Sequence, residues 1–96
     1  MISFTVRFQF APEDREEIAG ILRQLAAESH KEPGCVSYIP HQVEGDPDTV
    51  VIYEQYKDAM ALAAHRASDH FQKFAVGGLF QKMRDRAVEN LTALEA

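Results

Sequence analysis

Residues 49–65 read TVVIYEQYKDAMALAAH and join the most strand-like segment of the chain to a capped helix. β-Branched and aromatic side chains on both faces of residues 49–56 predict a central strand. Asp58 precedes an apolar run, as an N-cap residue does at the start of a helix. Glu54 and Tyr56 are two residues apart, so they share one face of the strand with apolar neighbours. The sequence therefore predicts a carboxylate in an apolar environment.

The chain upstream of this stretch predicts two strands and a helix. Residues 2–10 alternate apolar and polar side chains with a period of two, which indicates a half-buried strand. A helix is expected to begin at Pro12 and to end at Pro33, because apolar residues between them recur every three or four positions. Residues 35–43 predict a second strand, which Pro40 interrupts or ends. Turn residues then connect this strand to the central one as a hairpin.

The chain downstream of the capped helix predicts short helical turns and a last strand. Ser68 is the expected cap of a second short helical turn, and Gly77-Gly78 is expected to break it. The remaining expected elements are a helical turn at residues 79–83 and a strand at residues 86–94.

The order strand, helix, strand, strand, helix, strand predicts an α+β fold of the ferredoxin-like split βαβ type. Residues 1–96 are expected to form a single domain, because 96 residues leave room for only one core. Helices should cover one face of the antiparallel sheet and leave the other face bare. A second copy of the chain is the natural cover for that face, so we expect a homodimer.

Charge and hydropathy argue against several partners. The chain has 10 Lys and Arg residues against 15 Asp and Glu, a net charge of −5, and lacks the basic surface that nucleic acid binding requires. No apolar run reaches the ~18 residues of a membrane span, and the alternating first strand does not resemble a signal peptide. The single cysteine, Cys35, favours a reducing compartment and a buried structural thiol. We therefore expect a cytoplasmic protein with no nucleic acid or membrane partner.

Glu54 and His65 are the leading candidates for chemistry. His65 follows Ala61 by four residues and Leu62 by three, on the apolar side of its helix. A strand carboxylate that faces a helix imidazole is suited to act as a general base with its orienting group. The same pair also fits a structural role, in which Glu54 holds the helix on the sheet. His70 is a further candidate, although an exposed or capping imidazole also fits its position.

The sequence shows no motif for a metal or a nucleotide. The four histidines are too scattered for a metal-ligand motif, and Gly77-Gly78 lacks the spacing of a phosphate-binding loop. Phe71, Phe74 and Phe80 could line a pocket for a flat aromatic ligand, although aromatic residues at helical spacing also fit a plain core. We therefore expect no metal and no cofactor.

Three segments of the chain resemble the antibiotic biosynthesis monooxygenase family. They read PGCVSY at residues 33–38, YEQYKD at residues 53–58 and AHRASDHF at residues 64–71. The resemblance spans nearly the whole chain. It implies a dimer in which two ferredoxin-like sheets form an α/β barrel. Several members of the family oxidise quinols or polyketide phenols with molecular oxygen and without metal or flavin, and the resemblance implies the same here.

The resemblance also implies roles for individual residues. It places the family's strand glutamate at Glu54 and its two helix histidines at His65 and His70. Tyr56 stands where the family usually has Trp.

Two other branches of this fold are similar to the chain in part. Haem-degrading relatives depend on an Asn, Trp and His set; this chain has no Trp, and Val6 and Ala75 stand at the other two positions, which disfavours haem degradation. The isomerase of the phosphorylated autoinducer-2 signal is similar at the end of the central strand. Its phosphorylated substrate would need an inward-pointing cation, for which the candidates are Arg7, Lys57 and Arg66.

The leading hypothesis from the sequence is a cofactor-independent monooxygenase of a small quinol or phenol. His65, oriented by Glu54, would remove the phenolic proton, and the electron-rich phenolate would reduce oxygen. Tyr56 and Tyr38 would position the ring, and His70 would be a second proton carrier. The other residues expected to bind the substrate are Phe71, Phe74 and Arg7.

Two alternatives stay open at this stage. One is isomerisation of a small keto compound, with the same Glu54 and His65 as acid and base. The other is a dimer without catalytic activity that binds an aromatic metabolite.

Overall fold

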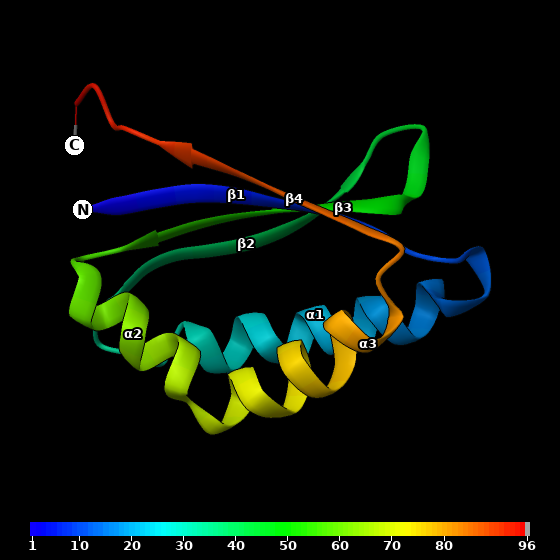
Figure 1. The fold of residues 1–96 in the computed structure, drawn as a ribbon, viewed down its shortest axis with the longest axis horizontal. Helices are drawn as coiled ribbons and strands as arrows, with labels where there is room; N and C mark the ends of the chain where they lie inside the picture. Colours follow the sequence, from blue (N-terminus) through cyan, green and yellow to red (C-terminus); the bar gives the residue numbers. More distant parts are fainter. Residues whose placement is uncertain (96) are drawn as a thin grey trace.

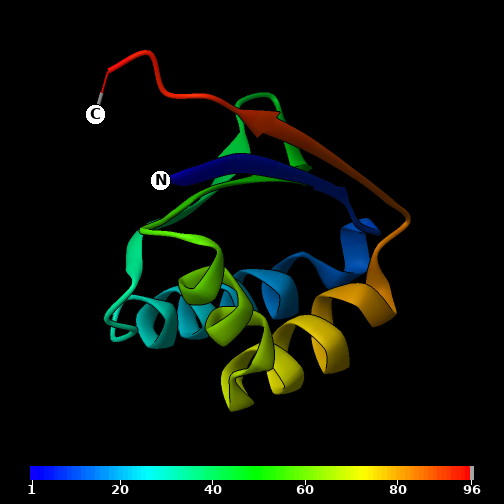
Figure 2. The same ribbon diagram turned by 60° about the vertical axis from the view of Figure 1, so that its left-hand side comes forward.

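Four strands form one antiparallel sheet in the order β2-β3-β1-β4, and helices cover one of its faces (Figure 1 and Figure 2). The structure is a computed structural model and describes residues 1–95. The strands are β1 (Ile2–Gln9), β2 (Cys35–Val43), β3 (Asp46–Tyr56) and β4 (Asp85–Leu91). The helical segments are η1 (Pro12–Asp14), α1 (Arg15–Ser29), α2 (Ala59–Ala67), the π-helical η2 (Phe71–Leu79) and α3 (Phe80–Lys82). This arrangement confirms the predicted ferredoxin-like α+β fold.

The core lies between the sheet and the helical layer. The paired residues Val6 of β1 and Ile52 of β3 point into it and are only 4% and 1% exposed. From α1, the buried apolar side chains are Ile18, Leu22 and Leu25, which recur at the spacing of one helix face. The alternation in β1 and the apolar stripe in α1 are therefore the sequence patterns that specify the core.

Strand β2 continues past Pro40, where the sequence predicted an interruption or an end. Pro40 is paired with Ile52, and β2 runs on to Val43. β2 lies at the edge of the sheet, where a residue without a backbone N–H is tolerated. The register shifts between Gln42 and Val43 instead.

The helix after α2 runs through Gly77-Gly78, so the predicted break at these glycines is wrong. The backbone is helical from Asp69 to Lys82, with η2 in the π conformation. A Cβ atom at Gly78 would lie 3.2 Å from Cδ1 of Ile21, so the missing side chain lets η2 approach α1 closely. The last strand, β4, ends at Leu91 rather than at the predicted residue 94.

The sheet face away from the helices carries a mixture of apolar and polar side chains. Ile39 of β2 is paired with Tyr53 of β3, and Tyr53 with Thr5 of β1, so the three share this face. Ile39 is 47% exposed, and every residue of β4 is exposed. None of the helices within residues 1–95 combines the length and the apolar character needed to cross a bilayer.

Gly34 brings the turn between α1 and β2 against α2. A Cβ atom at this position would overlap the side chain of Ala61, and the Gly34 carbonyl accepts a hydrogen bond from the Lys57 amide at 3.0 Å. The end of β3, the start of α2 and this turn therefore meet with no room for a side chain. The contact fixes the place of Glu32, two residues earlier in the turn.

We predict that Gly34→Ala lowers the free energy of unfolding by about 1 to 3 kcal/mol, because the new methyl group overpacks the contact with Ala61. Gly20 is the matched control, since nothing lies within 4 Å of a Cβ atom placed there in the middle of α1. Gly20→Ala should raise the free energy of unfolding by about 0.5 to 1 kcal/mol through helix propensity. Urea denaturation measures both, and equal stabilities of the two variants would contradict the prediction.

Candidate functional site

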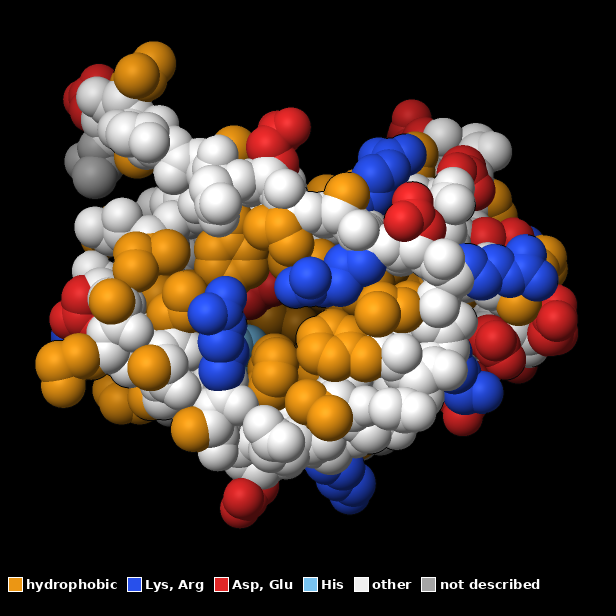
Figure 3. All heavy atoms as spheres, viewed as in Figure 1, with side chains coloured by type: hydrophobic (Ala, Val, Ile, Leu, Met, Phe, Trp, Pro, Cys, Tyr) orange, Lys and Arg blue, Asp and Glu red, His pale blue; other side chains and the backbone are white. Residues whose placement is uncertain are grey.

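A cavity of about 50 Å³ lies between the inner face of the sheet and the helical layer. Figure 3 shows its surroundings: basic side chains flank a hollow in an apolar surface, and acidic and histidine atoms are visible inside it. The polar residues that line the cavity are Tyr38, Glu54, His65, Arg66 and Arg86. The apolar lining residues are Phe4, Val6, Phe8, Ile52, Leu62, Phe71, Ala75, Leu79 and Phe80.

Glu54 projects from β3 into this cavity and is 6% exposed. The Tyr56 hydroxyl donates a hydrogen bond to Oε1 of Glu54 at 2.6 Å. Burial raises the pKa of Glu54 to about 7, although the Tyr56 hydrogen bond and the positive charges of Arg66 and Arg86 act in the opposite direction. Glu54 is therefore able to hold or release a proton near neutral pH.

His65 lies at the end of α2 and is 2% exposed. Its Nδ1 is 2.8 Å from Oε2 of Glu32, and its Nε2 is 3.8 Å from Oε1 of Glu54. A carboxylate only accepts hydrogen bonds, so we assign the ring proton to Nδ1, which donates to Glu32. Nε2 is then unprotonated on the Glu54 side of the ring. Burial lowers the pKa of His65, which keeps the imidazole neutral at pH 7.

Aromatic rings hold the imidazole in this orientation. The ring centroids of Tyr56, Phe71 and Tyr38 lie 5.0, 5.2 and 5.6 Å from that of His65. The Ser68 hydroxyl donates a hydrogen bond to the His65 carbonyl at 2.6 Å and caps the following helix at the Phe71 amide. The aromatic rings therefore pack around the imidazole, and Ser68 holds the backbone of His65.

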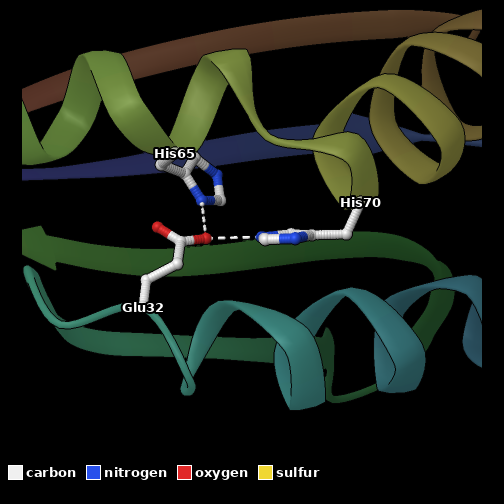
Figure 4. Close-up of side chains that lie close together, drawn as sticks. All are labelled: Glu32, His65 and His70. Carbon is white, nitrogen blue, oxygen red and sulfur yellow. Dashed lines mark hydrogen bonds and ion pairs between the residues drawn. The ribbon is translucent and has the colours of Figure 1, made fainter.

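His70 shares the carboxylate of Glu32 with His65 (Figure 4). Its Nε2 is 2.5 Å from Oε2 of Glu32, and its side chain is 17% exposed. The three residues come from the turn after α1, the end of α2 and the residue before η2. Glu32 therefore links the buried imidazole of His65 to a second imidazole closer to the surface.

The comparisons with known proteins agree with this architecture. The sequence model of the family described as antibiotic biosynthesis monooxygenase matches residues 1–76. The chain belongs to this family. A protein of Bacillus subtilis (strain 168) named "Putative monooxygenase YcnE" is 32% identical over 78 residues, which cover 81% of this chain and 82% of that protein.

Solved structures of similar proteins share the whole fold. PA3566 from Pseudomonas aeruginosa is 29% identical with a TM-score of 0.88, and the match covers 98% of this chain and 94% of that one. Rv0793 from Mycobacterium tuberculosis is 25% identical with a TM-score of 0.87, covering 99% of this chain and 96% of that one. Membership of the antibiotic biosynthesis monooxygenase family and the names of its relatives support a monooxygenase-like role in general terms.

The structure brings together only part of the substrate-binding set that the sequence predicted. Tyr38 and Phe71 line the cavity. Tyr56 is fully buried behind Glu54, to which it is hydrogen-bonded. Phe74 lies instead beside a surface depression near α1, and Arg7 is exposed on the opposite face of the sheet. Both residues therefore lie outside this cavity, because Phe74 faces α1 and Arg7 alternates with the inward side chains of β1.

Glu32 and Arg86 enter the site from segments that the sequence did not connect to it, whereas Arg66 directly follows His65 on α2. The sequence predicted Glu54 as the orienting partner of His65, whereas Glu32 makes that hydrogen bond from 33 residues away. Arg66 was one of the candidates for binding a phosphate, and Arg86 was not among them. The only local signal for Glu32 is its place directly before Pro33-Gly34, where a helix-ending turn meets a strand.

We predict that Glu54→Gln removes a pH-dependent loss of stability. The folded-state pKa of Glu54 is raised from 4.5 to about 7. The contribution of protonated Glu54 to the free energy of unfolding is therefore complete below pH 4.5 and is lost as the pH rises through 7. A glutamine keeps the acceptor for Tyr56 and carries no charge. The free energy of unfolding of Glu54→Gln, relative to that of the wild type, should therefore increase by about 2 kcal/mol between pH 5 and pH 8.

Urea denaturation at several pH values measures this difference. Glu16→Gln is the matched control, because Glu16 is an exposed carboxylate of α1. Its stability relative to the wild type should stay nearly constant over the same range. A difference for Glu54→Gln that does not change with pH would contradict the raised pKa.

Proposed function

We propose that this protein oxidises a small phenol or quinol with molecular oxygen, without a metal or a flavin. The observation that carries this proposal is the orientation of His65. Glu32 holds the proton at Nδ1, so the unprotonated Nε2 is directed to the Glu54 side of the ring, in a cavity lined mostly by apolar side chains. A neutral imidazole in this tautomer is suited to take a proton from a phenolic hydroxyl.

The reaction balances for a phenol that carries hydrogen on the ring carbon to be oxidised. His65 takes the phenolic proton at Nε2, and the phenolate carbon forms a bond to oxygen. The resulting peroxide receives the proton from the imidazolium. Loss of the ring C–H proton and cleavage of the O–O bond then give a quinone carbonyl and one molecule of water. The substrate supplies all four electrons that the oxygen molecule takes up.

Neighbouring groups support the charge that develops on the substrate. Burial raises the pKa of Tyr38, so its hydroxyl stays protonated and is available as a hydrogen-bond donor in the cavity. Arg66 and Arg86 line the same cavity and favour a phenolate over a neutral phenol. Glu54 in its protonated form adds no negative charge beside the phenolate.

We predict that His65→Ala lowers enzyme-dependent oxygen uptake with a panel of reduced quinones and phenols about 10²-fold or more, because the general base is lost. Glu32→Gln should lower the turnover number about tenfold and change the Michaelis constant little, since an amide can donate to Nδ1 and favour the wrong tautomer. Substrate autoxidation is subtracted as the blank, and the protein is freed of metal ions first.

The matched controls are His41→Ala and Glu16→Gln, which alter an exposed imidazole and an exposed carboxylate outside the cavity. Both should turn over at the wild-type rate. Uptake that survives His65→Ala would remove His65 from the mechanism, and no uptake above the blank with any compound would contradict the oxygenase.

A second candidate function is isomerisation of a small anionic keto compound. The observation in its favour is the pair of arginines at the cavity, since guanidinium groups bind phosphate and carboxylate in a bidentate manner. Glu54 and His65 would then act as acid and base on neighbouring carbons. Conversion that proceeds at the same rate in anaerobic buffer would select the isomerase over the oxygenase.

We further propose that two copies of the chain pair through the uncovered face of the sheet. The helices leave this face open, Ile39 is 47% exposed on it, and β4 is exposed along its whole length. A second sheet of the same kind would remove these apolar side chains from water. The proposal agrees with the α/β barrel that the family resemblance implies.

We predict that Ile39→Glu weakens this dimer, because it replaces an exposed apolar side chain of this face with a charge. The measurement is light scattering after gel filtration, in which the wild type should show twice the 10.8 kDa mass of the chain. Val76→Glu is the matched control, since Val76 is 37% exposed on the helical side. A wild-type protein with the mass of one chain would overturn the dimer.

A further inference from the structure

Glu32, His65 and His70 form a cluster on the side of the His65 ring away from Glu54 (Figure 4). One carboxylate oxygen and one ring nitrogen from each histidine all lie within 4.8 Å of one another. Both imidazoles point at the same oxygen, Oε2 of Glu32. The proposed oxygenase reaction takes the substrate proton at the other nitrogen of His65, so the three donor atoms of the cluster lie outside that proton transfer.

Two imidazole nitrogens and one carboxylate oxygen are a ligand set that Zn²⁺ and related divalent transition metals bind. Metal to ligand distances of about 2.0 to 2.2 Å require donor atoms a little more than 3 Å apart in a tetrahedral site. The two nitrogens lie 2.8 and 2.5 Å from the shared oxygen, so small side-chain rotations would accommodate an ion. The ion would replace the two protons that now bridge these atoms.

The surroundings of His65 also suit a ligand. A metal-bound imidazole usually donates its other N–H to a carboxylate, which fixes the ring and raises its basicity. Glu54 stands 3.8 Å from Nε2 of His65 and is itself held by the Tyr56 hydroxyl at 2.6 Å. With a metal at Nδ1, the ring proton moves to Nε2 and faces Glu54.

An ion has a route to this cluster from solvent. His70 lines a surface depression between α1 and η2 that also contains the carboxylates of Glu28 and Asp69. Lys73 contributes a positive charge to the same depression. His70 and Glu32 are 17% and 15% exposed, which leaves their side of the cluster accessible to water as a further ligand.

We propose that Glu32, His65 and His70 bind one divalent transition metal ion of the Zn²⁺ type, and that the bound ion switches the site off. The inhibitory half of this proposal rests on the proposed function, because it requires Nε2 of His65 as the base. A metal at Nδ1 places the ring proton on Nε2, and a protonated Nε2 cannot accept a proton from the substrate. The ion is thus a reversible inhibitor and takes no part in the reaction.

No pattern in the sequence predicts such a site. Glu32 lies 33 residues before His65 and 38 before His70, so no short motif holds the three ligands. The predicted absence of a metal site came from the scattered histidines. Folding brings two of the four together on one carboxylate.

We predict that metal-stripped wild-type protein binds one Zn²⁺ or Co²⁺ ion per chain in isothermal titration calorimetry. Glu32→Gln and His70→Ala should each weaken binding at least tenfold, since each removes a ligand. Circular dichroism verifies that both variants are folded. His41→Ala and Glu16→Gln are the matched controls for binding by surface residues, and both should keep the wild-type affinity.

The inhibition is measured on the same samples as the ratio of turnover with Zn²⁺ to turnover without it. Zn²⁺ should lower the turnover of the wild type at least tenfold relative to its own metal-free rate. For His70→Ala, the ratio of the two rates should stay near one. Unchanged affinity in Glu32→Gln and His70→Ala, or no binding by the wild type, would overturn the site. Full turnover by the Zn²⁺-loaded wild type would overturn the inhibition. Calorimetric binding by a protein that oxidises no substrate would establish the site and contradict the proposed function instead.

Discussion

The imidazole of His65 is almost completely buried between two carboxylates, and the rest of the site is arranged around it. Nδ1 lies 2.8 Å from Glu32 and Nε2 lies 3.8 Å from Glu54, so each ring nitrogen lies near a different carboxyl group. Burial without partners would be costly for a polar ring, and the hydrogen bond to Glu32 offsets that cost. It also fixes which nitrogen is unprotonated. α2, the turn after α1 and β3 meet at this one side chain.

The close approach at Gly34 couples the fold to this site. The turn between α1 and β2 can touch α2 only because position 34 has no side chain next to Ala61. That contact brings Glu32 to His65, and the Lys57 amide bonds to the Gly34 carbonyl at the end of β3. Glu54 and Tyr56 lie just before this point on β3. One sterically restricted contact therefore positions both carboxylates relative to the imidazole.

The sequence predicted the parts of the site that depend on local periodicity. The period of two in β3 placed Glu54 on the inner face, and the spacing of three and four residues placed His65 on the buried side of α2; the structure shows both. Arg7 lies on the face away from the cavity, because side chains alternate along β1, and its charge alone says nothing about this direction. Glu32 and Arg86 could not be found this way. Their positions depend on how the turn after α1 and β4 pack against α2, which no local pattern encodes.

The charges around the cavity suit a substrate that becomes anionic. Arg66 and Arg86 act to keep the pKa of Glu54 low, and burial outweighs them and raises it to about 7. When Glu54 is protonated, its neutral carboxyl group does not balance the positive charges of the two guanidinium groups. A phenolate would supply the balancing negative charge, and its arrival would favour the protonated form of Glu54 still further. In the proposed reaction, deprotonation of the substrate and protonation of Glu54 therefore reinforce each other, whereas an ionised Glu54 would repel the phenolate from the imidazole of His65.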